Sequence, residues 1–176
     1  MLRAPSPSLS QLPDVPARQS VPNAARTIFT QRANAVVPLH WLSTAAAFSG
    51  TGGLVSGDDL ADLIRHRCEV AGWLPDTQPV SLVARWIVNR AVVSLDSPWG
   101  PMFPLFQFDL PTAAVVDAMA PLLDELRPVF DDVELALWFV TPNDWLSGAR
   151  PVSAMHHSLP AVLQAARADR FVAGGH

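Results

Sequence analysis

The stretch Asp131–Val152, DDVELALWFVTPNDWLSGARPV, decides the fold class that we expect for this chain. It opens with Asp131 as a helix N-cap and Glu134 three residues later, which together form the capping-box pattern. The residues that follow are apolar almost all round, so we expect a helix in the middle of a core, with a buried strand as the alternative. Pro142 ends this helix because the residue before a proline avoids helical geometry.

The residues after this helix predict a tight corner. Asn143 or Asp144 caps one short helical turn that Gly148 stops, and Arg150 is held extended by the proline that follows it. Two tryptophans and a lone arginine in such a stretch are typical of a pocket rim or of a packed corner, and we favour the corner. Its expected structural residues are Trp138, Pro142, Asn143, Trp145, Leu146, Gly148 and Pro151.

Amphipathic helices are expected in the first half of the chain. Pro38 starts a helix over 38–48, which stops at the glycine-rich segment 50–53 that we interpret as a flexible hinge. A second helix begins after Ser56, which stands three residues before an aspartate in a weak capping pattern, and it ends at Gly72.

A short helix over 80–89 and a β-hairpin follow. The apolar face of this helix is expected to contain Leu82, Val83, Trp86 and Ile87. The runs AVVSL at 91–95 and MFPLFQF at 102–108 favour strands, and the DSPWGP between them favours a turn. Pro104 lacks a ladder donor, so we expect it in an edge strand or at a strand's start. Trp99 in the turn has little core to enter, and we expect it to be an exposed contact residue.

Two helices are expected around the corner in addition to the helix that enters it. Thr112 caps the first, which Pro121 kinks, and its apolar stripe contains Val115, Met119, Leu122 and Leu126. The last helix starts at Ser158 and extends to Arg170. The expected fold is therefore mainly α with one small β-hairpin: a helix-turn-helix-like N-terminal part followed by a compact helical C-terminal domain.

Composition and pattern divide the chain into three parts. Residues 1–34 are rich in Pro and Ser and show no sustained apolar periodicity, which is typical of a flexible tail. Residues 35–110 are expected to form a helical region with the helix-turn-helix-like pair and the hairpin. Residues 111–176 are expected to form the helical C-terminal domain.

Composition also excludes several chemistries. All 12 positively charged residues are arginines, and the absence of lysine rules out Schiff-base catalysis and a lysine-containing phosphate loop. The net charge of −4 gives no general attraction to phosphate backbones. The single Cys68 cannot form an internal disulfide, and no apolar run reaches the ~18 residues of a membrane span. We therefore expect a cytoplasmic protein without a membrane contact.

No set of residues predicts a catalytic centre, a metal site or a cofactor. The acidic pairs 58–59 and 131–132 lie at expected helix N-termini, where carboxylates act as caps. Side chains diverge within each candidate pair of metal ligands, which are His66 with Cys68 and His156 with His157. We therefore expect a protein that is not an enzyme, and a small enzyme with a pocket near Trp138–His157 is one alternative.

Three stretches carry a family resemblance: FPLFQFD at 103–109, LALWFVTPNDWLSGARPV at 135–152 and LPAVLQAARADRF at 159–171. Together they resemble bacterial antitoxins of the Xre/MbcA/ParS type, which have a DUF2384-like toxin-binding domain. The resemblance covers about half of the chain, from roughly Ser81 to Phe171. In that family an apolar helix, a Pro-Asn turn, a Leu-x-Gly-x-x-Pro corner and a final helix form the domain.

The resemblance implies a non-catalytic antitoxin of a type II pair. Its final helix and tail would cover a partner toxin, often an NAD-degrading one with the RES fold. The corner residues would then be structural, and the expected partner-binding residues are Arg150, Arg167, Arg170 and Phe171.

The other alternative is a winged helix-turn-helix regulator of transcription that binds DNA. In that case 80–89 is the recognition helix and 91–108 is the wing. Arg85 and Arg90 would contact the DNA backbone, with Trp99 as a further contact residue. We also expect the chain to form a homo-oligomer.

Overall fold

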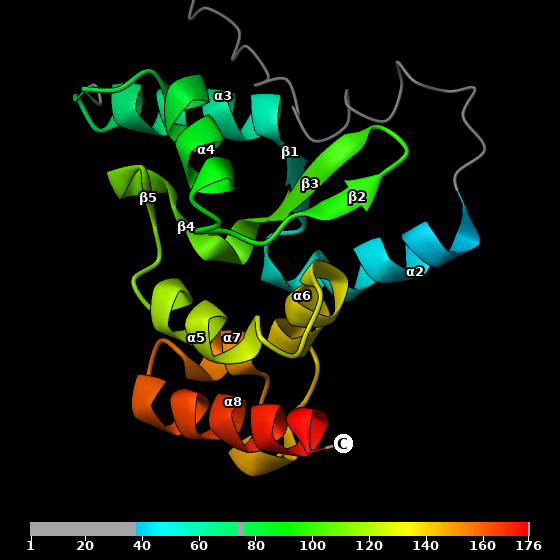
Figure 1. Ribbon diagram of the computed structural model, residues 1–176. Helices are drawn as coiled ribbons and strands as arrows, with labels where there is room; N and C mark the ends of the chain where they lie inside the picture. The colour runs from blue at the N-terminus through cyan, green and yellow to red at the C-terminus, as the bar shows by residue number, and fades with distance from the viewer. Residues whose placement is uncertain (1–37, 74–75, 176) are drawn as a thin grey trace, which may run out of the picture. The chain divides into compact units, whose positions relative to one another are not determined.

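The first half of the described chain forms three α-helices, two of which pack against each other, and a small antiparallel sheet (Figure 1). The computed structural model describes residues 38–73 and 76–175, which belong to one compact unit over Val36–His176. The expected tail at 1–34 lies outside the described residues. In chain order the elements are α2 (Leu39–Ala47), β1 (Leu54–Ser56), α3 (Gly57–Val70), α4 (Pro79–Val88), β2 (Leu95–Ser97) and β3 (Gly100–Pro104).

The second half is mainly helical, and α5 and α8 lie side by side in it (Figure 1). A two-stranded antiparallel pair, β4 with β5, precedes these helices. The elements are β4 (Phe108–Asp109), β5 (Ala114–Val115), α5 (Met119–Leu126), α6 (Asp132–Val140), the 3-10 turn η4 (Asp144–Leu146), α7 (Pro151–Ala154) and α8 (Leu159–Gly174). The predicted fold class, mainly α with small β elements, is confirmed.

The capped helix starts predicted at Ser56 and Asp131 are present. Ser56 caps α3 by accepting a hydrogen bond from the Asp59 N–H at 3.2 Å. Asp131 and Glu134 form the reciprocal capping box at the start of α6, with bonds of 2.8 and 3.0 Å. Gly72, just after α3, has the left-handed φ of 77° that favours glycine at a helix end.

The glycine-rich segment 50–53 begins within a 3-10 turn, Ser49–Thr51, and leads directly into strand β1. This strand pairs with β3, with Val55 opposite Phe103, and the sheet order is β1-β3-β2. The expectation that Pro104 lies at an edge or at a strand's start is therefore wrong, since it ends the central strand. Strand β2 pairs with β3 only as far as Met102, so Pro104 has a neighbouring strand, β1, on one side only. Proline is tolerated there because it has no N–H to donate and no second neighbour needs one.

The helix expected from Thr112 begins later. Val115 is not helical; it pairs with Phe108 in the β4–β5 ladder, and α5 starts only at Met119. Pro121 consequently falls in the first turn of α5, where a backbone N–H has no intrahelical acceptor, so no kink is needed.

The core is divided into two clusters of buried side chains. The first surrounds α6, whose Leu135, Ala136 and Phe139 are fully buried, and it receives Trp41 and Phe48 from the α2 region. This cluster thus contains side chains from both of the expected parts, 35–110 and 111–176. The second cluster lies between α3, α4 and the sheet, and is built on residues that include Leu60, Ile64, Val83, Trp86 and Phe103. We expected Ile87 on the apolar face of α4 that packs on this cluster, but it is 44% exposed.

Candidate functional site

The predicted corner is held together by the carboxylate of Asp169 on α8. Its Oδ2 accepts hydrogen bonds from Trp138 Nε1 and from Asn143 Nδ2, both at 2.7 Å, and its Oδ1 accepts one from Trp145 Nε1 at 2.9 Å. The three donors come from α6, from the turn after it and from η4. Because hydrogen bonds to an ionised acceptor are roughly twice as strong as neutral ones, this carboxylate ties the corner to α8.

Asn143 is the centre of the turn itself. Its backbone N–H donates to Ala149 O at 3.1 Å, and its carbonyl accepts from Leu146 N at 3.0 Å and Gly148 N at 2.9 Å. Its side-chain Oδ1 caps η4 by accepting from Trp145 N at 2.9 Å. Asn143 is 9% exposed, so a buried polar residue has each of its groups bonded.

The remaining corner residues have the local roles that the sequence predicts. Gly148 has a φ of 81° after η4, and Pro151 is the buried first residue of α7. Leu146 packs against the first core cluster, whereas Pro142 is exposed. Trp145 is 61% exposed although its indole N–H is bonded. The corner is therefore a packed joint with one exposed aromatic ring.

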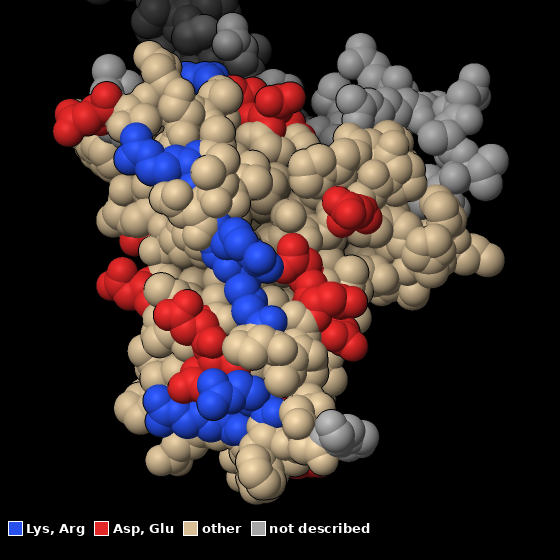
Figure 2. All heavy atoms as spheres, in the orientation of Figure 1, with Lys and Arg blue, Asp and Glu red and all other residues tan. Residues whose placement is uncertain are grey.

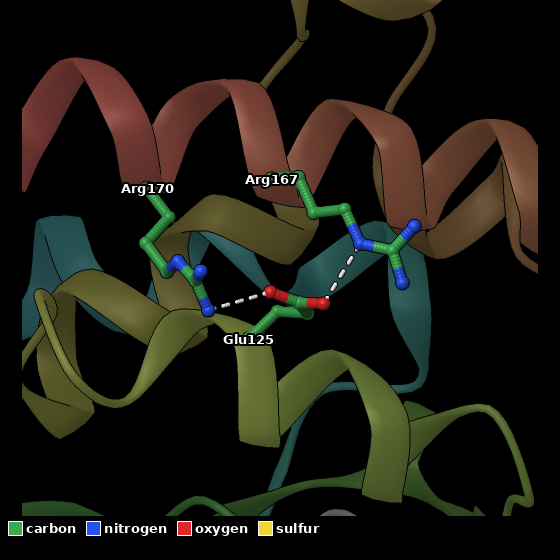
Figure 3. A network of polar contacts seen from close by, with 3 residues as sticks. All are labelled: Glu125, Arg167 and Arg170. Carbon is green, nitrogen blue, oxygen red and sulfur yellow. Dashed lines mark hydrogen bonds and ion pairs between the residues drawn. The ribbon is translucent and has the colours of Figure 1, made fainter.

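A second polar contact joins α8 to α5 (Figure 3). Glu125 on α5 lies between Arg167 and Arg170, accepting from Arg167 Nε and from Arg170 Nη1 at 2.8 Å each. The bond from Arg167 is the largest cause that holds the pKa of Glu125 below its usual value; burial opposes it and the charge of Arg170 adds to it. Both arginines keep about half of their side-chain surface exposed, 60% and 47%.

The C-terminal end of α8 presents an apolar surface. Phe171 is 81% exposed and Val172 is 61% exposed. A shallow hollow of about 270 Å³ beside them is lined by Pro128, Val129, Arg170, Phe171, Gly174 and Gly175. Three of the four predicted partner-binding residues are thus brought together on the last two turns of α8. The fourth, Arg150, is extended before Pro151 as expected and lies beside Gly50.

The residues proposed for DNA contact lie on and after α4. Arg85 and Arg90 are exposed, and Arg90 has a left-handed φ of 53°. Trp99 differs from expectation: its ring packs against the first core cluster, and its Nε1 is buried without a hydrogen-bond partner among the described residues. A hairpin this short brings its turn close to the core, so Trp99 is half-buried. In Figure 2 arginine side chains form separate patches interleaved with acidic ones.

Two further polar side chains, which no local sequence pattern marks, hold the loop between α4 and β2. Gln107 is fully buried, accepting from Val93 N at 2.6 Å and donating to Val93 O at 2.9 Å. Arg127, after α5, donates to the carbonyl oxygens of Arg90 and, at 3.0 Å, of Val92. Burial is the largest cause that lowers the pKa of Arg127, and the charge of Arg90 adds to it. Gln107 and Arg127 thus both hold this loop through hydrogen bonds to its backbone.

An open groove of about 1030 Å³ runs between β4–β5 and α7. It is lined by part of the stretch for which we considered an enzyme pocket, namely Val152, Ser153, Met155 and His156. Asp109 and Asp117 are its acidic residues. Within residues 38–73 and 76–175, no group of three or more His, Cys, Asp or Glu side chains is placed to hold a metal ion. Trp138 and the η4 corner do not line this groove.

Comparison with known proteins gives no relative for this chain: no family model, no curated protein and no solved structure matches it. In the part of the chain that the structure describes, none of the helices has the length and apolar character to cross a bilayer.

Proposed function

We propose that this chain is a non-catalytic protein that binds a partner toxin through the C-terminal end of α8, as the antitoxin of a type II pair does. The single observation that carries the proposal is the exposed pair Phe171 and Val172 beside the hollow at that end. Exposed apolar patches mark interaction sites, and aromatic residues with arginine are enriched among binding hot spots. The resemblance of 103–109, 135–152 and 159–171 to the Xre/MbcA/ParS antitoxins supplies the class of partner, with a RES-type toxin as the expected example.

The anchoring of α8 supports this role. Asp169 ties one side of the helix to the corner, and Glu125 ties another side to α5. A rigid helix loses little conformational entropy when a partner binds, which favours affinity. Arg167 and Arg170 each use one N–H on Glu125, so the remaining donors of their guanidinium groups are available to acceptors on a partner.

The proposal is tested by co-expression of the full tagged chain with the product of each neighbouring gene. We expect one of these products to copurify and the chain to relieve its toxicity in growing cells. Phe171→Asp should weaken the complex by about 30-fold, the effect of losing a hot spot worth ~2 kcal/mol. Leu39→Asp is the matched control, because Leu39 on α2 is equally exposed at 83%.

Two results would overturn the proposal. One is that neither neighbouring product copurifies with the chain. The other is that Phe171→Asp, shown by circular dichroism to melt like the parent chain, holds the partner as tightly as Leu39→Asp does.

DNA binding is a second candidate function, and one observation favours it. The chain order β1–α3–α4–β2–β3, a helix pair followed by a hairpin, is the order of elements in a helix-turn-helix with a wing. Arg85 and Arg90 would then contact phosphates. Replacing either with alanine should weaken binding to any duplex and lower the slope of log affinity against log salt by ~0.9 per lost contact. An unchanged slope in both variants would exclude this role for α4.

A further inference from the structure

Helix α4 presents an apolar face that no described residue covers. Val80, Ala84 and Val88 lie at i, i+4 and i+8, which places them on one side of a helix. Val80 is 56% exposed, Val88 is 80% exposed, and Ala84 is exposed as well. Val83 and Trp86 on the other side are buried in the second core cluster. The helix is therefore apolar on its outward side as well as on its core side.

This outward face is symmetric about Ala84. One valine stands four residues before Ala84 and the other four residues after it. If two copies of α4 pack antiparallel about a twofold axis at Ala84, Val80 of each copy meets Val88 of the other. The small side chain at the centre lets the two backbones approach closely, and a twofold interface requires such self-complementarity.

Charges at the two ends of α4 favour the same arrangement. Asp76 lies three residues before the helix and Arg90 two residues after it, and both are exposed. Antiparallel packing brings Asp76 of one copy near Arg90 of the other at both ends, whereas parallel packing would place like charges together. The helix dipoles are also opposed favourably in the antiparallel pair.

We propose that α4 mediates an antiparallel homodimer, with a second copy of this chain as the occupant of the Val80–Ala84–Val88 face. The face differs from a surface that binds a phosphate backbone, because its centre is apolar. The proposal is independent of the partner at α8, which uses a different helix.

Light scattering on the full chain over a concentration series tests this directly. We expect the mass to rise from 19.0 kDa towards twice that value at high micromolar concentration, because the small side chains of one helix face bury little surface and interfaces that bury little surface are weak. Val88→Glu should keep the melting temperature of the dilute chain and hold the mass at 19.0 kDa. A wild-type mass that stays at 19.0 kDa, or a dimer that Val88→Glu leaves intact, would overturn the proposal.

Engineered cysteines test the geometry. Ala84→Cys should form a disulfide-linked dimer on mild oxidation, since the two thiols meet at the axis, while native Cys68 is buried and does not react. Ser81→Cys is the matched control on the same helix. Position 81 lies three residues from the twofold axis in each copy. The two engineered thiols are therefore about 9 Å apart along the helix axis, which is too far for a disulfide. Equal crosslinking of both variants would contradict the antiparallel register.

A charge exchange tests the orientation. Asp76→Arg alone and Arg90→Asp alone should each weaken the dimer, and the double variant should restore it. Single reversals without effect, or a double variant no better than the singles, would refute the pairing of these ends. A different result would be a chain that is monomeric at every concentration and that loses binding to duplex DNA in Val88→Glu. In that case the face binds DNA and the homodimer proposal is overturned.

Discussion

Replacing Asp169 with alanine should destabilise the chain by about 3 kcal/mol. The carboxylate accepts three side-chain hydrogen bonds, two of which, from Trp138 and Asn143, are partly buried. Hydrogen bonds to a charged group contribute roughly 1.5 kcal/mol or more each, and the exposed one from Trp145 contributes less, about 0.5 kcal/mol. At about 3 °C per kcal/mol for a domain of this size, the melting temperature should fall by about 10 °C.

Thermal and urea unfolding of three variants provides the measurement. Asp169→Asn retains one acceptor oxygen for Trp138 and Asn143, so its free energy of unfolding should fall by about half as much as that of the alanine variant. Asp124→Ala is the matched control, because Asp124 is an exposed residue of α5 and its loss should stay within about 0.5 kcal/mol. An Asp169→Ala variant as stable as Asp124→Ala would refute the account of the corner as a hydrogen-bonded brace.

Three further predictions follow from the other polar contacts. Gln107→Ala should cost about 3 kcal/mol in urea unfolding, because it leaves the buried N–H and C=O of Val93 without partners. Arg127→Lys should recover less than half of the stability that Arg127→Ala loses in the same assay, because one ammonium cannot reach both carbonyls as the planar fork does. The pKa of Glu125 is depressed in the folded state, so its stabilising effect is present above the unfolded value of about 4.3 and is lost as the pH falls through the folded pKa. Melting curves from pH 6 to 3 should therefore decline less steeply for Glu125→Gln than for the parent chain, and identical slopes would count against the ion pair.

Features set by neighbouring residues could be predicted from the sequence. The caps at Ser56 and Asp131 depend on bonds to residues three positions away, and the η4 corner with its left-handed Gly148 is equally local. Strand β1 could not be predicted in the same way. Its three residues are too few to show the alternation of apolar and polar residues that marks a strand, and they form a strand only because β3 lies beside them. Nor could the late start of α5 be predicted, because the stripe through Val115 fits a helix as well as it fits the observed turn.

The site residues show the same division. The corner residues were predicted, but their acceptor Asp169 was not, because 24 to 31 positions separate it from its donors. One signal could have found it: Val162, Ala166 and Asp169 follow at i, i+4 and i+7, so the acid lies on the buried stripe of α8 and needs donors. No comparable pattern marks Arg127, whose acceptors are backbone carbonyls of a distant loop.

Hydrogen–deuterium exchange of the full chain, alone and with the copurified gene product, tests most directly the claim that the corner braces a docking face on α8. We predict slower exchange in the complex over residues 167–175, with the corner at 142–150 protected to the same extent in both states. Protection confined to the groove residues 106–118 and 152–159, with the end of α8 unchanged, would contradict the account.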